Sequence, residues 1–74
     1  MNIQARIFVA LMNEGVDVWR PVSATAHSDG QFEILGIVPS EESWQFAPGT
    51  RVRCKETVFA DGSKGLVAYE PVAL

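Results

Sequence analysis

One histidine and one cysteine, His27 and Cys54, are the side chains of this sequence that most readily suggest catalysis. His27 is followed directly by Ser28-Asp29, but a Ser-His-Asp triad is assembled from separated positions, and a contiguous trio in a turn cannot orient its members. Cys54 is flanked by two basic residues, whose side chains in a strand point to the opposite face and cannot activate the thiol. We therefore expect a solvated turn histidine and a buried cysteine rather than a catalytic pair.

The remaining chemical motifs are equally weak. One His and one Cys without ligand spacing predict no metal site. Glu41-Glu42 are adjacent in a loop and are expected to be solvated, whereas paired-acid catalysis needs two carboxyl groups about 5–10 Å apart in a concave site. The stretch Asp61–Gly65 is too short for a phosphate-binding loop. The sequence predicts a protein that is not an enzyme and has neither a metal nor a cofactor.

Aromatic residues give a stronger indication of binding. Trp19 beside Arg20 is the kind of aromatic and guanidinium pair that anchors protein interfaces. Strand alternation places Trp19 on a polar face, but Pro21 could mark a bulge that turns the ring inward. Trp44 and Phe46 either cover one end of the domain or form part of a recognition groove. These alternatives leave Trp19, Arg20, Trp44 and Phe46 as candidate protein-binding residues.

A basic stripe offers a second kind of binding. Arg51, Arg53 and Lys55 share one strand face at steps of about 6.6 Å, which could follow a phosphate backbone, while Phe8, Phe59 or Tyr69 offers a ring for base stacking. The alternative is a solvated face with loose ion pairs worth about 0–1 kcal/mol each. The formal net charge of −3 opposes general nucleic-acid binding. RNA or single-stranded DNA binding is therefore the alternative prediction.

Alternating apolar residues predict the elements that must carry these side chains. The pattern has period two with many β-branched residues, and turn-forming clusters separate the runs. Five strands are expected, at residues 3–11, 16–27, 31–37, 50–59 and 66–69. Residues 38–49 interrupt the pattern and could hold one helical turn at 39–43.

A chain of 74 residues with 47 % hydrophobic residues suits a single domain that spans residues 1–74. Five short strands predict an all-β fold, a small five-stranded, strongly bent antiparallel barrel of the SH3-like type. The OB alternative usually places a helix between its third and fourth strands, and residues 38–49 leave little room for one.

The sequence also gives expectations about location. No apolar run approaches the 18 or so residues of a membrane span. The first residues, Met1–Arg6, lack the zones of a secretion signal, and the single cysteine has no disulfide partner within the chain. We expect a complete cytoplasmic protein that does not contact membranes.

Several segments resemble small, uncharacterised bacterial proteins of SH3-like fold. They are residues 11–15, 16–22, 44–49 and 52–54, most specifically Trp19-Arg20-Pro21-Val22. The resemblance implies a fold and carries no activity, ligand or catalytic residue. A looser similarity is to Tudor-type and KOW-type barrels, which bind peptides or RNA. We therefore expect a non-catalytic module that binds another protein, with self-association as a further option.

Overall fold

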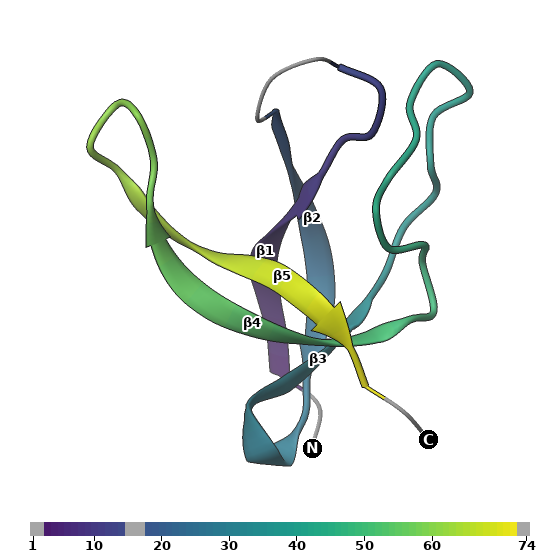
Figure 1. Ribbon diagram of the computed structural model, residues 1–74. Helices are drawn as coiled ribbons and strands as arrows, with labels where there is room; N and C mark the ends of the chain where they lie inside the picture. Colours follow the sequence, from purple (N-terminus) through teal and green to yellow (C-terminus); the bar gives the residue numbers. More distant parts are fainter. Residues whose placement is uncertain (1–2, 15–17, 73–74) are drawn as a thin grey trace.

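Five strands make up the computed structural model of the protein, which describes residues 3–14 and 18–72. They are β1 (Ile3–Ala10), β2 (Trp19–Ala26), β3 (Gln31–Ile34), β4 (Arg51–Val58) and β5 (Lys64–Pro71). The strands pair in sequence order and close into a barrel (Figure 1). The all-β prediction is confirmed, and the barrel is compatible with an SH3-like architecture.

The barrel closes through a parallel pair, although the sequence predicted an antiparallel sheet. Each neighbouring pair from β1 to β5 is antiparallel. Because every step of such a meander reverses the chain, the first and fifth strands run in the same direction. Phe8 of β1 accordingly pairs with Val67 of β5 in parallel.

The core lies on the inward face of the alternating strands. Ile7 and Val9 of β1 are fully buried, and Val22 and Ala24 of β2 lie across from Ile7 and Ala5. The buried cluster also contains Ile34, Val52 and Ala68. Removing these side chains from water supplies the main driving force for folding. The buried residues of β1 and β2 thus alternate with the period of two that the sequence predicted.

The third strand is shorter than the expected residues 31–37. The last bond that this segment makes to β2 is from the Leu35 N–H to the Ser23 carbonyl, 2.9 Å long. Gly36 follows with a φ of 101°, a conformation open to glycine that turns the chain out of the sheet. The segment 35–50 then forms a long loop before β4 begins.

The described part of β2 contains no bulge, so Pro21 does not shift the register. Residues Trp19 to Ala26 pair continuously with β1. Pro21 has no N–H to donate, and it lies where β3 is absent, since β3 pairs with β2 only from Ala24 to Ala26. The proposed start of this strand at 16–17 lies outside the described residues.

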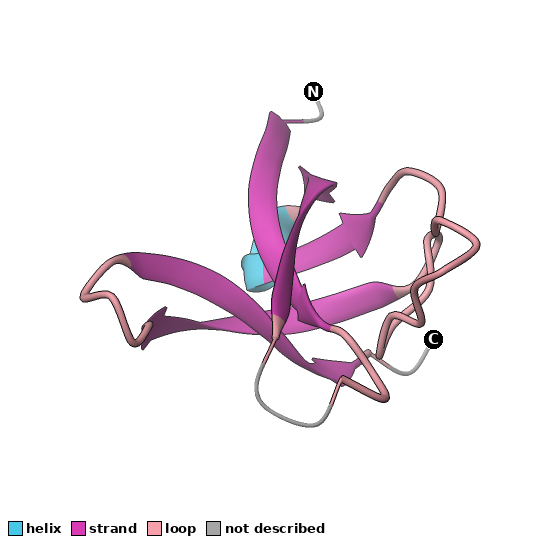
Figure 2. Ribbon diagram, turned by 90° about the horizontal axis from the view of Figure 1, so that it is seen from above, coloured by secondary structure: helices cyan, strands magenta, loops and turns pink. Residues whose placement is uncertain are grey.

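The only helical element among residues 3–14 and 18–72 is a short 3₁₀ turn, Ser28–Gly30, in the β2–β3 hairpin. At 39–43 the chain makes a single turn, in which the Glu42 N–H donates to the Pro39 carbonyl. The β3–β4 loop, residues 35–50, which contains this turn, is among the segments drawn in pink in Figure 2, where the molecule is seen from above. Among residues 3–14 and 18–72, no helix is long and apolar enough to cross a membrane.

Candidate functional site

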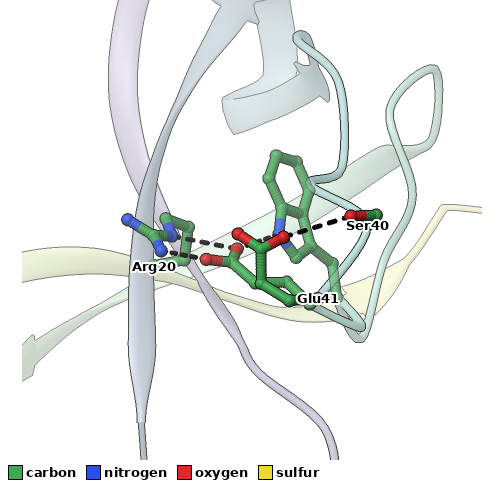
Figure 3. Close-up of polar contacts among 5 residues, drawn as sticks. Arg20, Ser40 and Glu41 are labelled. Atoms are coloured by element: carbon green, nitrogen blue, oxygen red, sulfur yellow. Dashed lines mark hydrogen bonds and ion pairs between the residues drawn. The ribbon is translucent and has the colours of Figure 1, made fainter.

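Three of the four predicted protein-binding residues are occupied by contacts within the chain. Arg20 continues the inward face of β2 beyond Val22 and meets the β3–β4 loop at the end of the barrel. Its Nε donates to Glu42 Oε1 at 3.1 Å, and its Nη2 forms an ion pair with Glu42 Oε2 (Figure 3). The indole Nε1 of Trp44 donates to the same carboxylate at 2.9 Å.

This Arg20–Glu42–Trp44 network holds the β3–β4 loop against the barrel. The hydrogen bond from Arg20 lowers the pKa of the Glu42 carboxyl, with a further contribution from Trp44, so the carboxylate stays ionised. Trp44 and Phe46 pack against the core cluster, and Trp44 forms a β-bridge with Leu11. These half-buried rings cover the end of the barrel.

Trp19 lies elsewhere, in an open groove between the end of β1–β2 and the tip of the β4–β5 hairpin. The groove has a volume of about 640 Å³. We call it the aromatic groove; its lining residues are Phe8, Val18, Trp19, Thr57, Val58, Phe59, Ala60, Asp61 and Ser63. Figure 1 shows the β4–β5 turn projecting on the side of the barrel away from the β3–β4 loop. The aromatic groove is therefore separate from the Arg20–Glu42–Trp44 network.

Three rings from three strands or strand ends form this groove. The Phe8 and Phe59 centroids are 4.8 Å apart in an edge-to-face arrangement, and the Trp19 and Phe59 centroids are 6.2 Å apart. Gly65 makes this packing feasible, because a Cβ there would lie 2.6 Å from Phe8 Cε1 and 2.9 Å from Phe59 Cε2. Trp19 is half-buried, which falls between the two alternatives that the sequence left open.

The hairpin tip is fixed by its own hydrogen bonds. The Phe59 N–H donates to the Ser63 carbonyl at 2.8 Å, and the Gly62 N–H donates to the Phe59 carbonyl at 2.9 Å. Asp61 Oδ1 accepts from the Ser63 N–H at 2.9 Å and from the Ser63 hydroxyl at 2.6 Å. These bonds lower the pKa of the Asp61 carboxyl. The groove therefore carries an ionised carboxylate held in one place.

The basic stripe is engaged in contacts within the chain. Arg51 Nη1 donates to the Gln31 side-chain oxygen at 3.4 Å, and Arg53 Nε lies 3.5 Å from a Glu70 carboxylate oxygen. Lys55 Nζ lies 5.6 Å from the centroid of the Tyr69 ring. Phe59, the fourth residue of the nucleic-acid alternative, packs in the aromatic groove instead. A phosphate backbone would have to compete with these contacts.

His27 and Cys54 have separate environments. His27 Nε2 lies 3.5 Å from Glu33 Oε1 and 3.5 Å from Arg51 Nη2. Cys54 packs against the core, and desolvation raises the pKa of its thiol to about 11, the opposite of what a nucleophile needs. Among the residues that the structure describes, no group of three or more His, Cys, Asp or Glu side chains could hold a metal ion.

Sequence reasoning missed Gly65 and Asp61, and it assigned Phe8 to the basic stripe rather than to a site with Trp19. Phe8 did give a signal, because it is the large apolar residue on the otherwise small or polar outer face of β1. Gly65 and Asp61 gave none, because both suit an ordinary hairpin turn. Their role depends on the approach of the β4–β5 hairpin to β1, which a local pattern does not encode.

Comparison with known proteins adds no assignment to this geometry. No protein family model, no curated protein and no solved structure matches the chain. What the site can do must therefore be argued from its own residues.

Proposed function

We propose that this protein is a non-catalytic binding module that holds an extended segment of another protein in the aromatic groove. The observation that carries the proposal is a solvent-open groove of about 640 Å³ with Phe8, Trp19 and Phe59 among its walls. Aromatic side chains supply large contact areas with little loss of rotational freedom on binding, and they dominate the energetics of protein interfaces.

Rigidity supports the same proposal. The Phe8 and Phe59 rings contact each other over Gly65, and the hydrogen bonds of Ser63 fix the hairpin tip. A groove that is already ordered loses less entropy when a ligand binds, so more of the contact energy appears as affinity. The main core lies on the inward face of the barrel, which leaves the groove available to a partner.

A selection from a random dodecapeptide library, displayed on phage against the intact protein, tests this function. We expect selected peptides, made synthetically, to shift the amide resonances of Phe8, Trp19 and Phe59. Trp19→Ala should weaken their binding at least tenfold, since central aromatic anchors commonly contribute about 2 kcal/mol or more. Tyr69→Ala is the matched control, because Tyr69 is an aromatic residue, 45 % exposed, outside the groove lining.

The controls decide the result. Circular dichroism checks that each variant is folded, and Trp19→Leu replaces the alanine variant if the latter is not. The proposal fails if no peptide binds, or if the selected peptides bind a folded Trp19 variant as tightly as the wild type.

Binding of RNA or single-stranded DNA through Arg51, Arg53, Lys55 and Phe59 is the alternative function. Titration of the protein with twelve-nucleotide oligo-U and oligo-dT, followed by the same amide resonances, distinguishes nucleic-acid binding from peptide binding. Affinity that falls steeply with salt and drops on Arg53→Glu would favour the alternative. We expect neither, because the three cations have partners within the chain.

The wider setting is part of the proposal. We infer a bacterial cytoplasmic protein related to the small SH3-like proteins that its Trp19–Val22 stretch resembles. The unpaired Cys54 and the barrel architecture support this setting.

A further inference from the structure

The charge of the aromatic groove indicates what kind of side chain it holds. Asp61 is the one ionisable residue in its lining among the residues that the structure describes. The other lining residues carry aromatic, aliphatic or hydroxyl side chains. An occupant of the groove therefore meets apolar walls and a single negative charge.

The two lysines of the same hairpin, Lys55 and Lys64, are not among the residues that line the groove. Lys64 pairs with Val58 in the β4–β5 ladder, whereas Thr57 pairs with Gly65. Because paired positions of a ladder share a face, Lys64 lies on the same face as Val58; it is exposed and is not among the lining residues. Lys55 lies over Tyr69. The carboxylate of Asp61 has its recorded contacts with Ser63, which is neutral.

The faces of aromatic rings attract cations, because the ring quadrupole is negative there. Lysine and arginine also carry a long apolar stem that packs on such rings while the charged end reaches a carboxylate. Phe59 and Asp61 are two residues apart in one turn, and both line the groove. Both halves of a basic side chain thus find a complementary surface in this groove.

We propose that the aromatic groove recognises a lysine or arginine side chain of the partner segment, with its stem over Trp19 and Phe59 and its charge beside Asp61. This inference rests on the proposed function and names the chemistry of the partner. The formal net charge of −3 favours the approach of a basic segment at low salt.

The selected dodecapeptides provide the test. We expect lysine or arginine to be enriched at one position. Replacing that residue with norleucine, which keeps an apolar stem and removes the charge, should weaken binding about threefold to tenfold. Asp61→Asn should weaken the parent peptide by a similar factor and leave the norleucine peptide unchanged. The loss of affinity caused by each of these changes should shrink as NaCl rises from 50 to 500 mM, because salt screens the attraction between the two charges.

Glu56→Gln is the matched control variant. It removes the same formal charge from the same hairpin at an exposed position outside the groove lining, and we expect less than a twofold change. The inference is overturned if peptides that shift the Trp19 and Phe59 resonances lack an enriched basic residue, or if they are indifferent to both norleucine and Asp61→Asn. Such a result leaves the proposed function intact, whereas the absence of any groove-binding peptide removes both.

Discussion

Replacing Gly65 with alanine tests whether two aromatic rings lie against the backbone of β5. Gly65 does not have a positive φ, so the backbone conformation itself accepts alanine. The obstacle is space, since the new Cβ would lie 2.6 Å from Phe8 Cε1, 2.9 Å from Phe8 Cδ1 and 2.9 Å from Phe59 Cε2. Ordinary contacts of a Cβ begin near 3.4 Å. Both rings must therefore move outward.

Two effects of opposite sign set the size of the change. Overpacking of this kind costs about 1–3 kcal/mol. Alanine in place of glycine within a strand returns roughly 0.5–1 kcal/mol, because glycine loses more conformational freedom on folding. The net expectation is a loss of about 0–2.5 kcal/mol in the free energy of unfolding, equivalent to a fall in Tm of up to roughly 20 °C for a domain of this size.

Urea unfolding followed by tryptophan fluorescence and by circular dichroism measures this loss. Coincidence of the two transitions supports a two-state treatment. The same substitution in a Phe8→Leu background is the control, because the shorter side chain relieves the clash and should at least halve the penalty. If Gly65→Ala is stabilising, or if its effect is the same in both backgrounds, the rings do not pack as described.

Two further outcomes follow from the carboxyl and thiol groups. Because hydrogen bonds from Arg20 and Trp44 lower the pKa of Glu42 in the folded state, its contribution to stability is present above the ordinary carboxyl pKa and is lost as pH falls through the lowered value. The difference in Tm between wild type and Glu42→Gln should therefore be largest near pH 7 and shrink as the pH falls below the ordinary carboxyl pKa; a difference that is constant with pH would contradict this. With its thiol pKa raised to about 11, Cys54 should react with iodoacetamide at pH 8 on the order of a hundredfold more slowly than free cysteine, as mass spectrometry can follow, and urea should remove the protection.

The alternation of apolar residues was enough to predict the five strands and the barrel. Ile7 and Val9, or Val22 and Ala24, are inward at the positions that a period of two assigns. The pattern did not predict where β3 ends, because that depends on Gly36 turning the chain out after the last bond to β2.

The candidate site was less predictable, because it depends on contacts between distant segments. Arg20 interrupts an apolar face because its side chain bonds to Glu42, which lies 22 residues later in the chain. Trp19 was identified from its type, but its neighbour Phe59 was assigned to a basic surface. Only the curvature that carries the β4–β5 hairpin over β1 brings these two rings together.

Phe8 has two roles that are coupled. Its backbone pairs with Val67, the single position at which β1 and β5 are recorded as pairing among the described residues, and its ring forms part of the groove. A ligand that contacts this ring should therefore also stabilise the β1–β5 pairing that closes the barrel. Ligand binding in the groove should suppress local opening of the β1–β5 pair. The backbone amides of this pair should then exchange more slowly the more tightly the ligand binds.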